Sequence, residues 1–228
     1  MVRFITIFAF IFIALPGFAL AQQVGNSDFY GSVTGLNRIK PLQNPEYQSS
    51  DKIVGRKILD NKNKVLGTVK DIVLTTNGSV SALYVDFDRL RLGSEVYLNY
   101  RTLNVEPIDN GYKLAYRDSQ IEEMYPQFLA DIESAAGEED DTLSLNAVVG
   151  SPVRNAEGTR IGEVESVLFG SEGSWAEALY ITMTSGTLRG QSVAVPFGLV
   201  EFKRAGKNME VSLNKAQSDA IVDYLRDR

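Results

Sequence analysis

Two residue types are missing from this chain of 228 residues, which contains no histidine and no cysteine. Neither a Ser-His-Asp nor a Cys-His nucleophile system can therefore form, and metal sites built from histidine or thiolate ligands are excluded. Disulfide bonds and a lipidated cysteine are excluded as well. Carboxylate pairs remain chemically possible for acid–base work, but no spacing among the 29 acidic residues indicates one. We expect no catalytic residue, no metal and no cofactor, and keep a carboxylate-dependent hydrolase as a minor alternative.

Long apolar runs are also scarce, and the one present lies at the N-terminus. A short positive start at residues 1–3 precedes an apolar run at residues 4–15, which Pro16-Gly17 interrupts before the small-residue site Ala19-Leu20-Ala21. This order is typical of a secretory signal peptide. An uncleaved anchor is the alternative, but the run is shorter than the roughly 20 residues of a spanning helix. We predict a signal peptide at 1–21, a mature protein beginning at Gln22 and no stable membrane span after cleavage.

Basic residues are outnumbered as well, because 23 Lys and Arg face 29 Asp and Glu, a formal charge of −6. Cleavage would remove Arg3 and leave 22 against 29, or −7. A nucleic-acid partner is disfavoured, since such binding relies on basic clusters that displace phosphate counterions. An export signal without cysteine suits the periplasm of a Gram-negative envelope better than a disulfide-rich secretory route.

The sequence then repeats itself. "VLGTVKDIVL" at 65–74 has the same skeleton as "RIGEVESVLF" at 160–169, with an offset of 95 residues. Single insertions shift the offset to 96 at Leu83-Tyr84-Val85 and to 97 after Gly93, so gaps fall only where loops are expected. Such self-similarity predicts a duplicated domain. We expect each copy to close around a hydrophobic core of its own.

Short apolar runs separated by turn residues indicate strands of a small barrel or sandwich. In the first copy the expected strands are residues 53–59, 65–74, 80–87, 95–100, 103–106 and 112–116, with turns at 60–63 and at Asn77-Gly78. The shared apolar positions 66, 69 and 72 are three apart, a spacing that fits a strand only if the strand contains a bulge. Gly67 and Gly162 are the expected places for it, so we interpret these glycines as structural.

A helical pattern follows each set of strands. Ser119 with Glu122 forms a capping-box pattern ahead of an amphipathic stretch that contains Pro126, and Asn214 is the expected cap of the C-terminal helix. We expect both helices to dock on their barrels, because a barrel of this size buries little apolar surface by itself; binding to a membrane surface or a partner groove is the alternative. The predicted fold is all-β with short accessory helices: two tandem six-stranded small β-barrels, each followed by an amphipathic helix.

The chain divides accordingly into five parts. They are the signal peptide at 1–21, a flexible tether at 22–51, the first barrel with its helix at 52–136, an acidic linker at 137–146 and the second barrel with its helix at 147–228. The tether is rich in Gln, Asn, Ser and Gly. An N-terminal extension without any role is the alternative for this segment.

The pattern of glycines and apolar residues resembles the PRC-barrel family, and "GSPVRNAEGTRIGEVESVLF" with "SVAVPFGLVEF" carries the resemblance best. This fold occurs in the cytoplasmic domain of the photosynthetic reaction centre H subunit and in the C-terminal domain of a ribosome maturation factor. The resemblance covers residues 53–116 and 147–213, although Asn99 stands where the second copy has Pro196. It implies a non-enzymatic adaptor fold that binds other proteins, with no catalytic residue and no cofactor.

Three aromatic residues are candidates for partner binding. Trp175, the single tryptophan, lies in a hairpin region where an exposed indole would anchor a partner, while covering the barrel end is the alternative. Tyr97 and Tyr100 would line a surface if their strand face is open; packing in the core or rim is the alternative. We predict an exported module that binds or scaffolds an envelope protein. The alternative is a small-ligand or polysaccharide binder that uses the cleft between the barrels.

Overall fold

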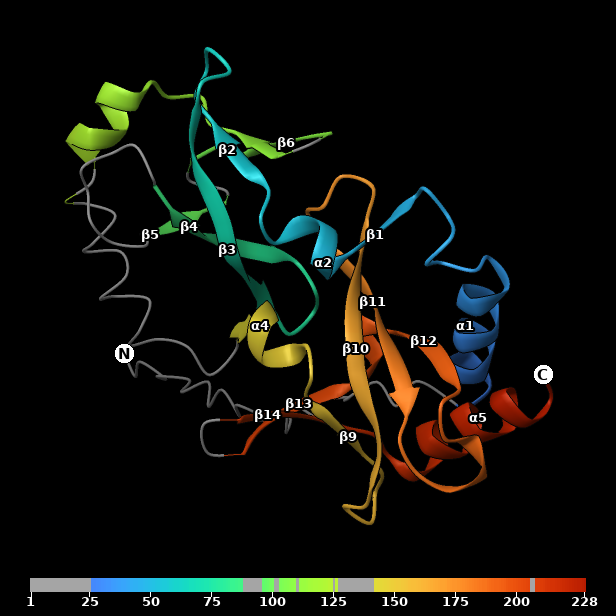
Figure 1. The fold of residues 1–228 in the computed structure, drawn as a ribbon. Coiled ribbons are helices and arrows are strands. Elements are labelled where there is room, and N and C mark those ends of the chain that lie inside the picture. The colour runs from blue at the N-terminus through green and yellow to red at the C-terminus, as the bar shows by residue number, and fades with distance from the viewer. Residues whose placement is uncertain are drawn as a thin grey trace, which may run out of the picture.

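The computed structural model of the protein describes residues 26–87, 96–100, 103–109, 111–124, 126, 142–205 and 208–228. The expected signal peptide and most of the segment between the two copies lie outside these residues. The described part of the chain is mostly β, with two sheets and a few short helices (Figure 1). Among the described residues, no helix has the length and apolar character needed to cross a membrane.

The first copy supplies six strands joined in the order β5-β4-β3-β2-β7-β6. Their bounds are β2 (Lys57–Leu59), β3 (Val65–Thr75), β4 (Val80–Asp86), β5 (Val96–Asn99), β6 (Glu106–Ile108) and β7 (Gly111–Lys113). The sheet is mixed, because β2 and β7 run parallel and the other neighbours antiparallel. Leu83 and Val85 of β4 are fully buried, as their alternation predicts.

The second copy repeats this arrangement in the order β12-β11-β10-β9-β14-β13. The strands are β9 (Pro152–Arg154), β10 (Arg160–Gly170), β11 (Ala176–Met183), β12 (Ser192–Pro196), β13 (Glu201–Ala205) and β14 (Asn208–Ser212), with the short 3₁₀ helices η1 (Gly186–Leu188) and η2 (Phe197–Leu199). The β9–β14 pair is again the parallel one. Two sheets with one strand order confirm the predicted duplication.

The long strands β3 and β10 contain the predicted irregularities. Against β2, the register of β3 skips Leu66 beside Gly67, and against β4 it skips Lys70. The register of β10 skips Ile161 and Glu165, the equivalent positions 95 residues later. Gly67 has a further role, since a Cβ there would lie 2.3 Å from the Asp86 carbonyl oxygen. The glycine allows β3 and β4 to approach closely.

A strand–helix segment precedes each sheet and joins the sheet of the other copy. β1 (Tyr47–Ser49) leads into α2 (Ser50–Ile53), and β1 pairs antiparallel with β10 of the second copy. β8 (Thr142–Ser144) leads into α4 (Leu145–Val148), and β8 pairs antiparallel with β3 of the first copy. Figure 1 shows β1 beside β10 and α4 beside β3. The two copies therefore exchange their first strand and helix.

The two exchanged segments pair at equivalent residues of the two copies. Ser49 lies opposite Leu168 and Ser144 lies opposite Val73, and each pair becomes the other when 95 is added or subtracted. Polar contacts hold both segments in place: Ser50 Oγ lies 3.0 Å from Ser166 Oγ, and the equivalent Asp71 accepts hydrogen bonds from the Ser144 hydroxyl at 2.5 Å and the Asn146 amide at 3.0 Å. The chain has the geometry of a dimer whose two protomers are fused.

The predicted strand at residues 53–59 is correct only in its last part. Ile53 ends helix α2, and Gly55 has a φ of +91°, so the chain turns before β2 begins at Lys57. A positive φ is favourable for glycine and breaks an extended run. The apolar Ile53 had the spacing of a strand residue, but it is buried by docking of the exchanged helix.

The turns that follow β3 and β10 cross each other. The Ala176 amide donates to the Gly78 carbonyl at 2.7 Å, the Val80 amide donates to the Ser174 carbonyl at 3.1 Å, and Ser79 and Trp175 form an antiparallel bridge. These two hydrogen bonds flank the Ser79–Trp175 bridge symmetrically, one in each direction. The crossing therefore lies on the pseudo-twofold axis that relates the copies.

Buried apolar side chains of both copies form one contiguous cluster. The expectation of a separate core for each copy is wrong. The exchanged segments explain the difference, because Ile53 and Val148 are fully buried and Leu143 is nearly so. Each copy thus covers part of its interior with residues that belong to the other.

Residues 26–53 do not form the flexible tether expected at 22–51. Helix α1 (Asn26–Arg38) packs against β12 and the C-terminal helix, with Phe29 and Val33 buried at helical spacing. The Asn37 side chain donates to the Ala194 carbonyl at 2.7 Å and accepts from the Ala194 amide at 2.8 Å. It thereby pairs with the outer backbone of β12, an end strand of its sheet. The segment is rich in polar residues and glycine, so its short apolar stripe did not indicate a helix in the sequence.

The helical predictions are confirmed at the C-terminus and are partly wrong after the first sheet. α5 (Lys215–Arg226) begins with the predicted cap, where Asn214 and Gln217 form a reciprocal capping box. Residues 118–124 are helical, so this helix begins one residue before Ser119, and Ile121 is buried. The later apolar positions of that stretch lie outside the described residues, as do residues 137–141 of the expected acidic linker, while 142–146 of that linker form β8 and the start of α4.

We predict that replacing Ser50 and Ser166 together with cysteine closes a disulfide across the exchange. The two hydroxyl oxygens are 3.0 Å apart and the residues are 116 positions apart in sequence. A loop of that length should add about 5 kcal/mol to the free energy of unfolding. A non-reducing gel with mass spectrometry checks the bond, and chemical denaturation with and without reductant measures the gain. Ser50→Cys alone is the control; cross-links between chains, or free thiols after oxidation, would contradict the exchange.

We also predict that Gly78→Ala destabilises the protein more than Gly158→Ala. Both glycines have positive φ, +101° and +76°, so both variants carry a backbone cost of roughly 1–2 kcal/mol. At Gly78 the added Cβ would also lie 2.4 Å from the Ala176 carbonyl oxygen, whereas nothing lies within 4 Å at Gly158. Urea denaturation of both variants measures the difference. Equal losses of unfolding free energy would show that the contact between Gly78 and the Ala176 carbonyl accommodates an added methyl group.

Candidate functional site

The described structure has one exposed indole, Trp175, and it lies where the two turns cross. Its exposed fraction is 45%, although its backbone bridges to Ser79 and its carbonyl accepts from the Gly170 amide at 3.2 Å. Both copies therefore fix the backbone that carries this side chain. An aromatic side chain held on rigid backbone loses little entropy when it is buried by a partner.

The neighbouring surface combines residues of both copies. Tyr47 and Gln48 come from the exchanged strand β1, and Gln48 donates through Nε2 to the Ser171 carbonyl of the second copy. Burial raises the pKa of Tyr47, and the nearby charge of Glu177 with a hydrogen bond to its carboxylate raises it further. We use the name seam surface for β1 together with residues 170–177.

A cavity of about 210 Å³ lies on the seam surface. Its walls are Gly170, Ser171, Glu172, Gly173, Ser174, Trp175 and Glu177. It offers an aromatic face and two carboxylates, a combination that suits contact with a basic or neutral polar group. The cavity is small for a drug-sized molecule, since ligand pockets usually hold about 300–1,000 Å³. The arrangement suits an anchor point in a larger protein interface.

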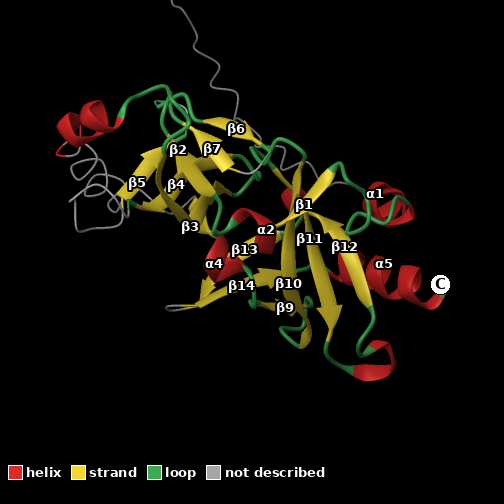
Figure 2. Ribbon diagram, turned by 45° about the horizontal axis from the view of Figure 1, so that its top comes forward, coloured by secondary structure: helices red, strands yellow, loops and turns green. Residues whose placement is uncertain are grey.

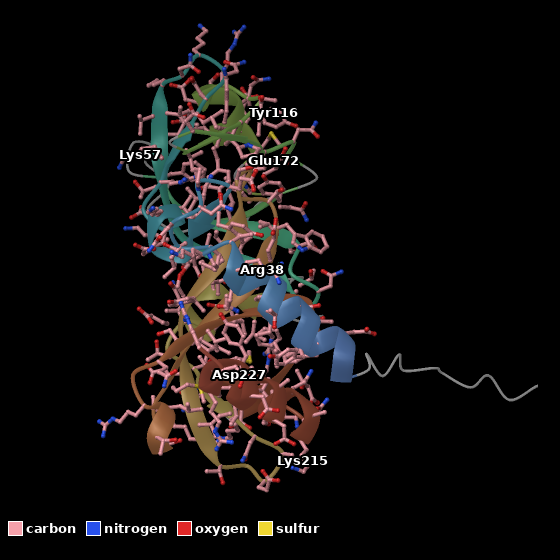
Figure 3. The ribbon with its side chains drawn as sticks, turned by 90° about the vertical axis from the view of Figure 1, so that its right-hand side faces the viewer. Arg38, Lys57, Tyr116, Glu172, Lys215 and Asp227 are labelled. Atoms are coloured by element: carbon pink, nitrogen blue, oxygen red, sulfur yellow. The ribbon has the colours of Figure 1, made fainter. Side chains whose placement is uncertain are left out.

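Tyr100 lies beneath the same turn, on the first copy. Its ring contacts Tyr112 edge-on at a centroid distance of 6.3 Å, and a Cβ on Gly173 would lie 3.3 Å from the Tyr112 hydroxyl. Figure 3 shows Glu172 of the second copy among the side chains of the first. Burial raises the pKa of Tyr100 to about 12, with a smaller contribution from Glu172. Tyr100 therefore supports the turn and is partly buried.

Tyr97 lies elsewhere. It faces Tyr84 across the β4–β5 pair, with ring centroids 4.8 Å apart. Of the three predicted residues, Trp175 and Tyr100 thus belong to one region, on the surface and beneath it, and Tyr97 belongs to a different part of the first sheet. Sequence reasoning missed Tyr47 and Glu177. Extending the 95-residue offset before residue 53 would have paired Ser49 with Ser144, but a single shared serine is a weak signal.

No group of three or more acidic side chains within the described ranges converges closely enough to hold a metal ion. The titratable side chains of the seam surface, Tyr47, Glu172 and Glu177, come from β1, from the turn after β10 and from β11.

Comparison with known families identifies the domain that is duplicated. The model of the PRC-barrel domain matches residues 45–120 and again residues 140–217. The two matches cover more than half of the chain, which therefore belongs to the PRC-barrel domain family and contains two tandem copies. The resemblance expected from the sequence is confirmed. Both matches include the exchanged strand, since they begin before β1 and β8. No curated protein matches the chain.

We predict that stability falls with rising pH between about 10 and 12. Burial raises the pKa of both Tyr100 and Tyr112 in the folded state, to about 12 for Tyr100, whereas an unfolded chain titrates near 10. Between these values the unfolded state loses phenolic protons that the folded state keeps, so their contribution, complete below pH 10, disappears as pH rises.

Tyr112→Phe tests this linkage. Tyr112 is fully buried, and its hydroxyl has no hydrogen-bond partner among the described residues. Its removal should leave the free energy of unfolding at pH 8 unchanged or slightly higher. It should also reduce the alkaline slope by up to about 1.4 kcal/mol per pH unit. Urea denaturation of both proteins from pH 8 to 11 provides the comparison, and parallel curves would contradict the assignment.

Proposed function

We propose that the protein is an exported, non-enzymatic module that binds or scaffolds another protein of the bacterial envelope. The carrying observation is Trp175, exposed by 45% on backbone that both copies hold. Tryptophan is among the residues most enriched at binding hot spots. The signal-peptide pattern of residues 1–21 supports export, and the absence of cysteine supports a Gram-negative periplasm.

The absence of histidine and cysteine supports a non-enzymatic role, because the usual nucleophile systems need one or the other. The formal charge of −6 disfavours nucleic acid as the partner. The proposal also includes the finer fold expectation that each six-stranded sheet closes into a barrel with a helix behind it. Identical strand order in both copies, with bulges at equivalent positions of β3 and β10, supports that closure.

One observation favours the alternative, a binder of a small ligand or polysaccharide at the junction of the copies. The cavity beside Trp175 has hydrogen-bonding groups and an aromatic face, which are the elements of a small-molecule site. Its volume of about 210 Å³ is the argument against, because most of a ligand would stay in solvent.

Affinity capture with Trp175→Ala separates these functions. Residues 22–228 are immobilised and exposed to envelope extract, and we expect specific proteins to be retained by the parent. Truncating a hot-spot tryptophan costs about 2 kcal/mol or more, so Trp175→Ala should lower retention about 30-fold. Leu42→Ala is the matched control, because Leu42 is equally exposed, at 46%, and lies outside the seam surface.

Three outcomes would contradict the proposal. Equal retention by Trp175→Ala, with its thermal midpoint close to that of the parent, would show that partners bind elsewhere. If no protein is retained but a glycan or metabolite raises the melting temperature of the parent only, the alternative replaces the proposal. Turnover of a substrate that disappears when two neighbouring carboxylates are changed to amides would favour the hydrolase.

A further inference from the structure

A larger cavity lies in the second copy, away from Trp175. It holds about 460 Å³ between α4, β9 and β14. The lining residues are Asn146, Ala147, Val149, Gly150, Ser151, Pro152, Arg154, Asn208, Met209 and Glu210. Its volume lies within the range of small-molecule and side-chain sites.

The duplication shows what occupies the equivalent place in the first copy. Three of the lining residues, at 146, 147 and 151, are 95 positions after Asp51, Lys52 and Arg56. The Arg56 guanidinium lies over α2, where Nε donates to the Lys52 carbonyl at 2.9 Å and Nη2 donates to the Gln48 side chain at 2.6 Å. In the first copy, this region is filled by a guanidinium of the chain itself.

The second copy has Ser151 at the position of Arg56, and a serine side chain is too short to reach across α4. The Ala147 carbonyl is the counterpart of the Lys52 carbonyl that Arg56 binds. Leu143 replaces Gln48, so one acceptor is lost, but Glu210 adds a carboxylate where the first copy has Gly111, because both residues hold the same register beside the parallel strand. The second copy thus keeps the helix carbonyl, exchanges the Gln48 acceptor for the Glu210 carboxylate, and has a serine in place of the Arg56 guanidinium.

We propose that this cavity binds a guanidinium group, supplied by an arginine side chain of a partner protein, in the place that Arg56 fills in the first copy. The planar guanidinium has five N–H donors in a fixed fork, which matches one carbonyl and one carboxylate better than an ammonium does. Glu210 retains acceptor capacity, because Arg154 contacts its Oε2 through a single Nε at 2.8 Å.

Electrostatics across the molecule favour the same ligand. The chain has a formal charge of −6, which attracts cations and raises their association rate. Within the cavity, Arg154 and Glu210 offset each other, so the incoming guanidinium meets no net positive charge. Arg154 also donates through Nη1 to the Gly158 carbonyl at 2.8 Å, so two of its nitrogens already have acceptors. The site is distinct from the seam surface and does not depend on the function proposed for it.

Titration of residues 22–228 with N-acetyl-arginine amide, followed by NMR of backbone amides, tests the proposal. We expect weak saturable binding with shifts concentrated in α4, β9 and β14. The lysine analogue N-acetyl-lysine amide should bind at least tenfold more weakly, because an ammonium lacks the fork. Acetate is the anionic probe and should produce no saturable shift at these residues.

Ser151→Arg is the decisive variant. It restores the arginine of the first copy, so its guanidinium should occupy the cavity and lower the affinity for the arginine probe at least tenfold. Leu42→Ala lies outside the cavity and should retain the affinity of the parent. If Ser151→Arg does not fold, Glu210→Gln serves in its place and should weaken binding several-fold by removing the acceptor charge.

Several results would overturn the site. Equal binding of the lysine and arginine probes would show a non-specific acidic surface, and saturable binding of acetate would show that Arg154 acts as an anion site. Unchanged affinity in Ser151→Arg would place the probe elsewhere. Loss of binding in Trp175→Ala would mean that the seam surface is the arginine site, which would contradict this inference while leaving the proposed function intact.

Discussion

The exchange of strand–helix segments between the two copies is the constraint on which the rest of the structure depends. β1 completes the sheet of the second copy and β8 completes the sheet of the first, and both continue into a helix that enters the shared core. A strand of three residues gains little from pairing by itself. The buried Ile53 and Val148 that follow supply the apolar burial, while Ser166 and Asp71 supply the polar contacts that orient it. Two small units thus obtain one larger core, which offsets the low burial of a domain of this size.

The same constraint places the candidate surface. Because the copies are related by a pseudo-twofold axis, their β3–β4 and β10–β11 turns meet at that axis, and hydrogen bonds in both directions join them. The backbone is symmetric here and the side chains are not, since the equivalent positions carry Ser79 and Trp175. Figure 2 shows α2 and α4 between the strands of the first copy and those of the second. Arg56 of the first copy and Ser151 of the second are likewise equivalent positions with different side chains, and Ser151 lines the cavity between α4, β9 and β14. Duplication has kept the scaffold, while polar and aromatic positions such as these have diverged.

Much of the fold could be predicted from the sequence, because strand periodicity and turn chemistry are local properties. The strands predicted at 65–74 and 80–87, the Asn77-Gly78 turn, the bulged long strands and the Asn214 cap all follow from neighbouring residues. The strand predicted at 103–106 is wrong, because β6 begins only at Glu106 and Asn104 has a positive φ of 46°. The exchange could not be predicted, since both possible partners of β1 carry the same pattern and only packing selects between β3 and β10. Helix α1 was missed for a different reason: its apolar stripe is two turns long and lies within a polar, glycine-containing segment. Among the candidate site residues, the exposure of Trp175 depends on how the turns cross, and this is a tertiary property.

The pairing of Tyr47 with Gly170 has a consequence for the order of events during synthesis. A ribosome delivers β1 long before it delivers β10, so the earliest strand has no template until more than half of the chain has been made. Contacts of such high sequence separation slow folding, because a long loop must close before any gain is realised. The N-terminal half cannot reach its native state alone in the meantime. The nascent polypeptide therefore remains incompletely folded until late in synthesis, with β1 still unpaired.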